Sequence, residues 1–426
     1  MSDFLLYTKV FPFIYIALCL SFATFIVISW KNIKWGVYLV CAFLPAYLIR
    51  FKGPLDIPMT ALEVMILVLF AVCVLKKQVA IPAKTEIKKN KLLLIGGSLF
   101  LFSATVAMFV SPDFRAAAGI WKAYFIEPLI FFIIFISVIE KEDTKNVIKA
   151  LGFSALYISL YAIAQKFLNV PIPTPWQTEM RATSIFPYPN AVGLFLAPLI
   201  PLLIYDLRFK ISDLLSKFFL SATIILSILT IVFAKSEGAI VALVASLSIW
   251  LFIKLKSRGK IVLSIIGSAA IVAILFLNFF PFPQIKEKLL LNDWSGIVRK
   301  TVWSETWEML QNAPIFGVGL SGHQTAIIPY HNAKWMEIFL YPHNIILNFW
   351  AETGILGLIG FIIIIIGFYK QLLSQKSEIG IYLFLSMTIL LIHGLVDVPY
   401  FKNDLSILFW ILIGMAILHP KQKIVD

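Results

Sequence analysis

Long apolar blocks recur along the whole chain, and they constrain its fold more than any other feature. Each block runs for roughly 16 to 24 residues, about the length of helix that crosses the hydrocarbon core of a bilayer. Hydrophobic residues occupy 60% of the 426 positions, and the mean hydropathy is +0.91, which is more apolar than a soluble domain. The sequence therefore predicts an all-α polytopic membrane protein, with a single integral membrane domain over residues 1–426.

The apolar blocks predict about 12–13 transmembrane helices. The predicted segments are 11–29, 35–50, 57–75, 92–110, 123–139, 147–168, 191–206, 218–234, 239–253, 261–280, 345–369, 379–396 and 405–418.

Basic residues gather in short loops between these segments. The stretch 76–91 carries six lysines against one glutamate, and 254–260 carries four positive charges and no negative ones. Such loops mark the cytoplasmic side of a membrane protein. The net charge of +13 thus reflects topology, and we expect no nucleic acid partner. The remaining loops then face the exterior, and 281–344 is predicted to be the one large extracytoplasmic loop.

The large loop is predicted to contain an amphipathic helix over 295–312, which Asp293 or Ser295 can cap. One face of it carries three apolar residues at i, i+4 and i+7: Trp303, Trp307 and Leu310. We expect this stripe to lie on the membrane surface or on other helices.

Positive charge on the predicted exterior side runs against the positive-inside pattern. Arg181 lies in the exterior loop 169–190, Lys235 in a short exterior turn, and Arg299 in the large loop. Guanidinium groups match phosphate oxygens with paired hydrogen bonds, so together these residues suit a diphosphate on a lipid carrier. The alternative for each residue is an ordinary lipid phosphate or a nearby acid.

A histidine lies where the large loop enters the next membrane segment. In Tyr341-Pro342-His343-Asn344, Asn344 is a good helix cap, and the amides of a helix start disfavour a charged imidazole. A neutral His343 at this boundary can act as a general base. A capping or interfacial role without chemistry is the alternative. Gly354 and Gly357 follow on one helix face, where they would let another helix approach closely.

Neither metal nor nucleotide chemistry is expected. The spacing of His323 and His331 from His343 matches no standard ligand set, and none of the three cysteines has a partner at metal-ligand spacing. Gly317–Gly322 reads as G-x-G-x-x-G, but it follows no strand of a βαβ unit. We interpret this motif as a flexible turn.

Five carboxylates lie inside or beside predicted membrane segments, and such acids are functional candidates by default: Glu63, Glu127, Glu237, Glu352 and Asp397. Glu127 and Glu237 could orient a basic partner or an acceptor hydroxyl near the exterior face. Ion pairs with Lys122 and Lys235 are the alternative.

Three stretches in this order resemble the bacterial O-antigen ligase and O-antigen polymerase superfamily. They are Arg181 with Pro189-Asn190, then Arg299 with the tryptophans and glycines that follow it, then His343-Asn344 with Gly354-x-x-Gly357. The resemblance covers roughly residues 180–360. The chain departs from the family at Lys235-Ser236-Glu237-Gly238, where many members have Ser-Arg-Gly.

The resemblance implies a GT-C-like helical fold and an inverting, metal-independent glycosyltransferase without a cofactor. The donor would be a glycan on undecaprenyl diphosphate, and the acceptor a sugar on a glycan, lipid or protein. Transfer would serve cell-surface polysaccharide, including lipopolysaccharide, biosynthesis at the extracytoplasmic face of the bacterial cytoplasmic membrane, in contact with membrane lipids.

The resemblance also assigns roles to residues of this chain. His343 would activate the acceptor hydroxyl. Arg181 and Arg299 would hold the diphosphate, with Lys235 supplying charge in place of the missing arginine. Four residues are expected to support them: Asn190, Glu237, Tyr341 and Asn344.

Two other functions are left open by the sequence. A transporter of a small anion or a lipid-linked sugar would place paired ionisable groups and broken helices near the bilayer midplane, whereas the candidate groups here lie at the exterior boundary. A non-catalytic assembly partner with a decayed site is the other alternative, because Glu237 stands where the family has arginine.

Overall fold

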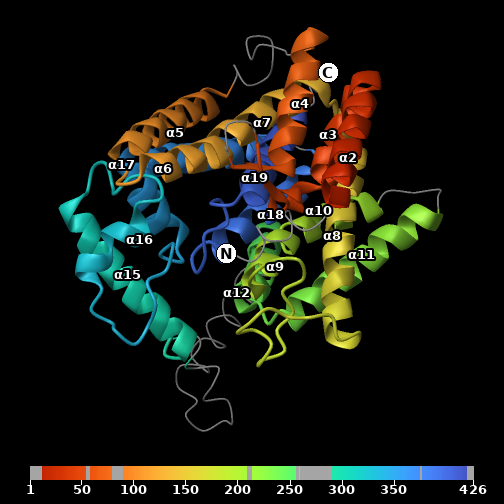
Figure 1. Cartoon of the computed structure of the whole chain (residues 1–426). Helices are drawn as coiled ribbons and strands as arrows, with labels where there is room; N and C mark the ends of the chain where they lie inside the picture. Colours follow the sequence, from red (N-terminus) through yellow and green to blue (C-terminus); the bar gives the residue numbers. More distant parts are fainter. Residues whose placement is uncertain are drawn as a thin grey trace.

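The computed structural model describes residues 12–53, 58–78, 90–208, 214–255, 290–374 and 377–419, together with Gly259 and Glu287. The predicted segment 261–280 and much of the two basic stretches lie outside these residues. The described part is mainly helical, with long loops and one small two-stranded antiparallel sheet (Figure 1).

The described elements follow one another along the chain, with the short 3-10 or π turns marked η. They are α2 (Pro12–Lys31), α3 (Ile33–Ala42), η1 (Leu44–Leu48), β1 (Arg50–Lys52), β2 (Pro58–Thr60), α4 (Ala61–Leu75), α5 (Lys91–Val110), α6 (Phe114–Trp121), η5 (Lys122–Ile126), α7 (Glu127–Val138), η6 (Lys141–Asp143), α8 (Thr144–Phe167), α9 (Pro189–Leu196), α10 (Leu199–Arg208), α11 (Leu214–Phe233), α12 (Glu237–Lys254), α15 (Trp294–Asn312), α16 (His323–Ala326), η7 (Ile328–Tyr330), α17 (Ile345–Ser374), α18 (Gly380–His393) and α19 (Asn403–Leu418).

Six helical stretches among the described residues are long and apolar enough to cross a membrane: Lys91–Val110, Phe114–Val138, Lys141–Phe167, Pro189–Arg208, Leu214–Phe233 and Ile345–Ser374. The shorter apolar helices are Ile16–Lys31, Ile33–Ala42, Ala61–Leu75, Glu237–Ile253, Gly380–His393 and Asn403–Leu418. All of these helices overlap predicted segments. The prediction of an all-α polytopic membrane protein is therefore confirmed.

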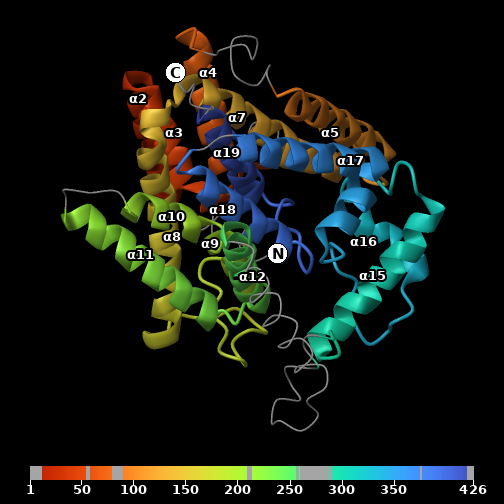
Figure 2. The ribbon, with the colours of Figure 1, turned by 180° about the vertical axis from the view of Figure 1, so that it is seen from behind.

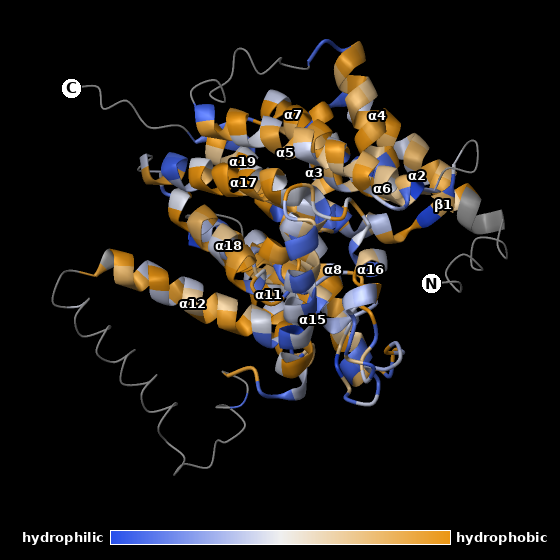
Figure 3. Cartoon of the chain, turned by 90° about the vertical axis from the view of Figure 1, so that its left-hand side faces the viewer, coloured by the Kyte–Doolittle hydropathy of each residue, from blue (hydrophilic) through white to orange (hydrophobic). Residues whose placement is uncertain are grey.

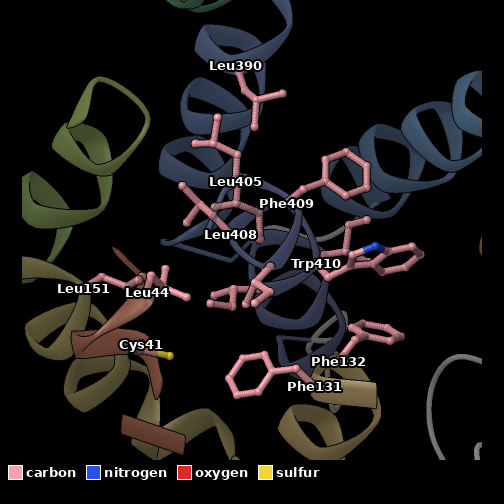
Figure 4. Packing of buried hydrophobic residues seen from close by; sticks show 14 of the residues in the cluster. Cys41, Leu44, Phe131, Phe132, Leu151, Leu390, Leu405, Leu408, Phe409 and Trp410 are labelled. Atoms are coloured by element: carbon pink, nitrogen blue, oxygen red, sulfur yellow. The ribbon is translucent and has the colours of Figure 1, made fainter. Parts of the chain in front are cut away.

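The core is centred on α19, which is buried along nearly its whole length. Phe409 and Trp410 of α19 meet the aromatic rings of neighbouring helices, and Trp410 lies 4.9 Å from Phe132 of α7 between ring centroids. Leucines at 405 and 408 fill the other side of the helix (Figure 4). In this structure α19 is enclosed by its neighbours, and the α18–α19 turn leads directly into it.

Helices α5 and α17 pack along each other as a pair at one side of the molecule (Figure 2). A Cβ on Gly96 would lie 3.0 Å from the carbonyl oxygen of Gly360, so the two backbones approach closely because both positions lack a side chain. Gly357 also faces this interface, where a Cβ would lie 3.3 Å from Ser103. The predicted packing role of Gly357 therefore agrees with the structure.

Gly354 has a different role from the one predicted. Its φ of 72° interrupts α17, and an added Cβ would overlap the carbonyl oxygen of Ile315. The same oxygen accepts a hydrogen bond of 3.0 Å from the amide of Ile355. The segment that approaches this glycine is thus a loop and not a second helix, and only glycine tolerates this conformation without strain.

The prediction of a flexible turn at Gly317–Gly322 was wrong. Gly317 and Gly319 both have positive φ, and the turn is packed between two helices. The amide of Val318 donates to the carbonyl of Ala351 in α17 at 2.8 Å, and the amide of Leu320 donates to Ala107 in α5 at 3.2 Å. The turn therefore ties the large loop to both helices.

The described part of the large loop is more polar than the bundle beside it (Figure 3). Asp293 caps α15 by accepting a hydrogen bond of 3.2 Å from the amide of Gly296, as predicted. Of the predicted apolar stripe, Leu310 is buried whereas Trp307 is 50% exposed, and Glu305 is buried on the same helix. Contact of the stripe with a membrane surface stays a prediction. The ring of Trp307 meets that of Trp350 in α17 edge-on.

Candidate functional site

Several of the predicted site residues meet at the turn between α18 and α19. The side chain of Asp397 in this turn is buried. Its Oδ1 lies 3.7 Å from Nδ1 of His343 and accepts a hydrogen bond of 2.9 Å from the amide of Val398. Its Oδ2 accepts a hydrogen bond of 3.3 Å from Nδ2 of Asn190. One carboxylate thus joins the start of α9, the start of α17 and the α18–α19 turn.

His343 is held by its neighbour Asn344. Oδ1 of Asn344 accepts hydrogen bonds from the amides of Ile346 and Leu347 at 3.0 and 3.1 Å, so it caps α17 as predicted. Its Nδ2 donates to the carbonyl of Leu395 at 3.0 Å, which fixes the start of α17 to the α18–α19 turn. The His343 side chain is 32% exposed and is accessible to a substrate.

The charge on Asp397 is retained despite its burial. Burial would raise the pKa of this carboxyl, but the nearby side chains of His343 and His393 and the hydrogen bond from the amide of Val398 lower it below its ordinary value. A carboxylate that stays ionised beside an imidazole fixes the tautomer of the ring and stabilises its protonated form.

Arg181 connects to the same carboxylate through Asn190. Its Nη2 donates to Oδ1 of Asn190 at 3.3 Å, and its Nε donates to the carbonyl of Ala234 at 3.1 Å. The guanidinium carbon lies 5.1 Å from the ring centroid of Trp176. Burial lowers the pKa of Arg181, and the nearby positive charge of Arg299 acts in the same direction.

Arg299 reaches the turn from α15. Its Nε donates to the carbonyl of Val396 at 3.2 Å, directly before Asp397 in the chain. Its Nη1 donates to Oγ of Ser295 one helical turn earlier, at 2.8 Å. The two arginines that the sequence singled out thus approach one turn from opposite sides.

Three other predicted residues have different contacts. Nζ of Lys235 donates to the carbonyl of Glu179 at 3.0 Å, so it holds the loop that carries Arg181. Glu237 is exposed at the first residue of α12, and its charge raises the pKa of Arg181. Tyr341 packs inward, 5.8 Å from the ring of Phe401.

Two residues near this turn were not recognised from the sequence as part of the site. Nζ of Lys402 lies 4.4 Å from the ring of Tyr188 and 5.1 Å from that of Phe186. It sits in a predicted exterior loop, so the argument used for Arg181 could have found it. His393 is buried at the end of α18, and no local pattern marks it.

The other two histidines of the large loop bind protein groups. Nε2 of His323 lies 3.0 Å from Oγ1 of Thr306, and Nδ1 of His331 lies 3.0 Å from Oε2 of Glu305. In the part of the chain that the structure describes, no group of three His, Cys, Asp or Glu side chains could hold a metal ion.

Comparisons with known proteins agree with the resemblance. Residues 222–362 match the family model of the O-antigen ligases. A putative polysaccharide ligase of Rickettsia felis is 28% identical over 149 residues, which are 34% of this chain and 35% of that protein. A putative polysaccharide ligase of Rickettsia conorii is 31% identical over 103 residues, 22% of this chain and 25% of the relative. The matched stretches thus span about a third and a quarter of these two relatives.

A longer match is found with the O-antigen ligase of Salmonella typhimurium, which is 24% identical over 300 residues, or 65% of this chain and 70% of that protein. The segment matched by the family model contains Arg299 and His343, whereas Arg181, Asn190 and Asp397 lie outside it. The comparisons support the O-antigen ligase superfamily.

Proposed function

We propose that this chain of the O-antigen ligase superfamily transfers a glycan from undecaprenyl diphosphate to an acceptor sugar, at the outer face of the bacterial cytoplasmic membrane. The family supports a polysaccharide ligase, and the apolar helices support a multi-pass membrane protein. The observation that carries the proposal is the connected series from Arg181 through Asn190 and Asp397 to His343.

His343 is the proposed general base. Its Nδ1 faces Asp397, so Nε2 on the other side of the ring takes the proton from the acceptor hydroxyl. The hydroxyl oxygen then bonds to the anomeric carbon, and the bond from that carbon to the diphosphate oxygen breaks, with its electron pair leaving on the diphosphate. A single displacement of this kind inverts the anomeric configuration. Asp397 stabilises the imidazolium that forms.

Arg181 and Arg299 are the proposed diphosphate-binding residues. Charge develops on the leaving oxygen in the transition state, and fixed cationic donors stabilise it there. Two guanidinium groups beside the reacting end can supply this charge, which supports a metal-independent reaction. We assign Lys235 to the loop of Arg181, because its ammonium group binds the carbonyl of Glu179.

The transfer reaction can be tested with purified protein in lipid nanodiscs. Undecaprenyl-diphosphate glycan and a set of acceptor glycans and lipids are supplied, and released undecaprenyl diphosphate is measured by mass spectrometry. We expect His343→Ala to reduce kcat by about 10²- to 10⁴-fold, the usual contribution of a general base. His419→Ala is the matched control, since His419 binds Thr144 at the other end of α19. Equal rates for His343→Ala and the wild type would overturn the proposed base.

A further inference from the structure

The segment that leads into the proposed base has no regular secondary structure. Residues 331–344 follow η7 and continue without helix or strand until α17 begins. His343 itself has a φ of 49°, a conformation that a non-glycine residue adopts only when its surroundings impose it. The position of the His343 ring therefore depends on contacts made by the residues before it.

A buried carboxylate of α15 binds the start of this segment. Glu305 is 6% exposed. Its Oε1 accepts hydrogen bonds from the amides of Asn332 and Ala333 at 3.0 and 3.3 Å, and its Oε2 lies 3.0 Å from Nδ1 of His331. Three donors from consecutive residues thus bind one side chain, which orders the backbone there.

His331 extends this contact along the segment. Its Nε2 lies 3.2 Å from the carbonyl oxygen of Met336. Both ring nitrogens therefore face oxygen atoms of the protein. Further along, Nε2 of Gln324 donates to the carbonyl of Ile338 at 3.1 Å. The backbone of 331–338 is therefore bound to α15 and α16 at several points.

Phe339, at the end of this segment, contacts the proposed base His343. The ring of Phe339 meets that of His343 edge-on, with centroids 5.1 Å apart and planes at 75°. On its Nδ1 side, His343 faces Asp397 at 3.7 Å. Phe339 thus supplies a contact of the imidazole that comes from the loop and not from the α18–α19 turn.

We propose that Glu305 and His331 are positioning residues for the transfer, because they hold the segment 331–340 so that Phe339 places the ring of His343. This inference rests on the function proposed above. Neither residue touches the reacting atoms, so the proposed effect is on the turnover rate and not on binding of the donor.

Kinetics of Glu305→Ala in the nanodisc assay test this proposal. We expect kcat to fall by about 10- to 100-fold, the loss that follows a misplacement of about 1 Å, with KM for the donor unchanged. Glu305→Gln keeps an oxygen for the two amides and should recover most of the rate. Glu308→Ala is the matched control, because Glu308 is exposed on the same helix and should leave kcat unchanged.

A chemical measurement tests the positioning role of Glu305 and His331 without any glycan. Diethyl pyrocarbonate modifies accessible imidazoles, and the modification rate at His343 is read by peptide mass spectrometry. Glu305→Ala should change this rate, while Glu308→Ala should not. If Glu305→Ala does not fold, Phe339→Leu tests the contact between Phe339 and His343. It should change the modification rate of His343 in the same way.

The outcomes separate the two proposals. If the wild-type protein transfers no glycan, the proposed function is overturned. If Glu305→Ala nevertheless alters the modification rate of His343, the positioning role of Glu305 is retained. The positioning role is overturned if Glu305→Ala or Phe339→Leu has the same kcat as the wild type and the same rate of modification at His343. A rise in donor KM with unchanged kcat would also overturn it, because Glu305 would then act on binding.

Discussion

Among the described residues, two histidine–carboxylate pairs lie on the predicted exterior side, and they differ in geometry. His331 and Glu305 are 3.0 Å apart, and both side chains are under 10% exposed. His343 and Asp397 are 3.7 Å apart, and the imidazole is 32% exposed. Both nitrogens of His331 face protein oxygens, so its ring has no position left for a substrate proton. This difference supports the proposal that His343, and not His331, is the base.

The largest effect expected from this comparison is that of Asp397→Asn. We expect kcat to fall by about 10²- to 10³-fold, because an amide neither fixes the His343 tautomer nor stabilises the imidazolium. The nanodisc transfer assay measures this loss. Asp206→Asn is the matched control, since Asp206 is equally buried but lies in α10, away from the α18–α19 turn. A similar loss in both variants would contradict a specific role of Asp397.

A second prediction concerns Arg181 and Arg299, which lie near the His343–Asp397 pair. Arg181→Lys and Arg299→Lys should each reduce kcat/KM by about 10- to 100-fold, because lysine keeps the charge but loses the planar fork. Arg115 is exposed on α6, and Arg115→Lys should behave as wild type. Full activity of both lysine variants would show that point charges suffice and would contradict paired guanidinium hydrogen bonds to the diphosphate.

A third prediction tests how the large loop is held beside α17. Gly354→Ala places a Cβ against the backbone of Ile315 at a φ of 72°, and the strain should cost about 2 kcal/mol. Thermal unfolding in detergent should show a lower Tm. Gly97→Ala is the control, since a Cβ there meets nothing within 4 Å. An unchanged Tm for Gly354→Ala would mean that the loop does not pack against this glycine.

The smallest expected effect is a pH dependence of stability. The pKa of Asp397 is lower in the folded chain than its ordinary value of 3.8, so the unfolded chain binds this proton more readily. Asp397 therefore stabilises the fold above about pH 4, and this contribution declines as the pH falls below that value. The Tm difference between wild type and Asp397→Asn should narrow from pH 6 to pH 3. A difference that widens on acidification would contradict the assigned direction.

Local features of this site could be predicted from the sequence. Asp293 and Asn344 cap their helices because a cap requires only a few adjacent residues. The sequence predicted Arg181, Arg299 and His343 as site residues because positive or titratable groups on the exterior side are uncommon. Each of these inferences depends on a short stretch of chain, or on the alternation of apolar segments.

Contacts between segments that are distant in sequence could not be predicted from sequence patterns. Asp397 was one of several acids near membrane segments, and its contact with His343 arises only when α19 packs into the core. The burial of Glu305 on α15 was not predicted, because the groups that contact its carboxylate come from residues 331–333. The positive φ of Gly354 likewise results from the approach of a loop that is distant in sequence.

A double-mutant cycle tests the central claim most directly, by measuring kcat for His343→Ala, Asp397→Asn and the double variant in the transfer assay. If Asp397 acts through His343, the double variant will be as slow as His343→Ala alone, because groups that act as a unit are not additive. Independent, multiplicative losses from the two substitutions would contradict the account, since the carboxylate would then act on something other than the proposed base.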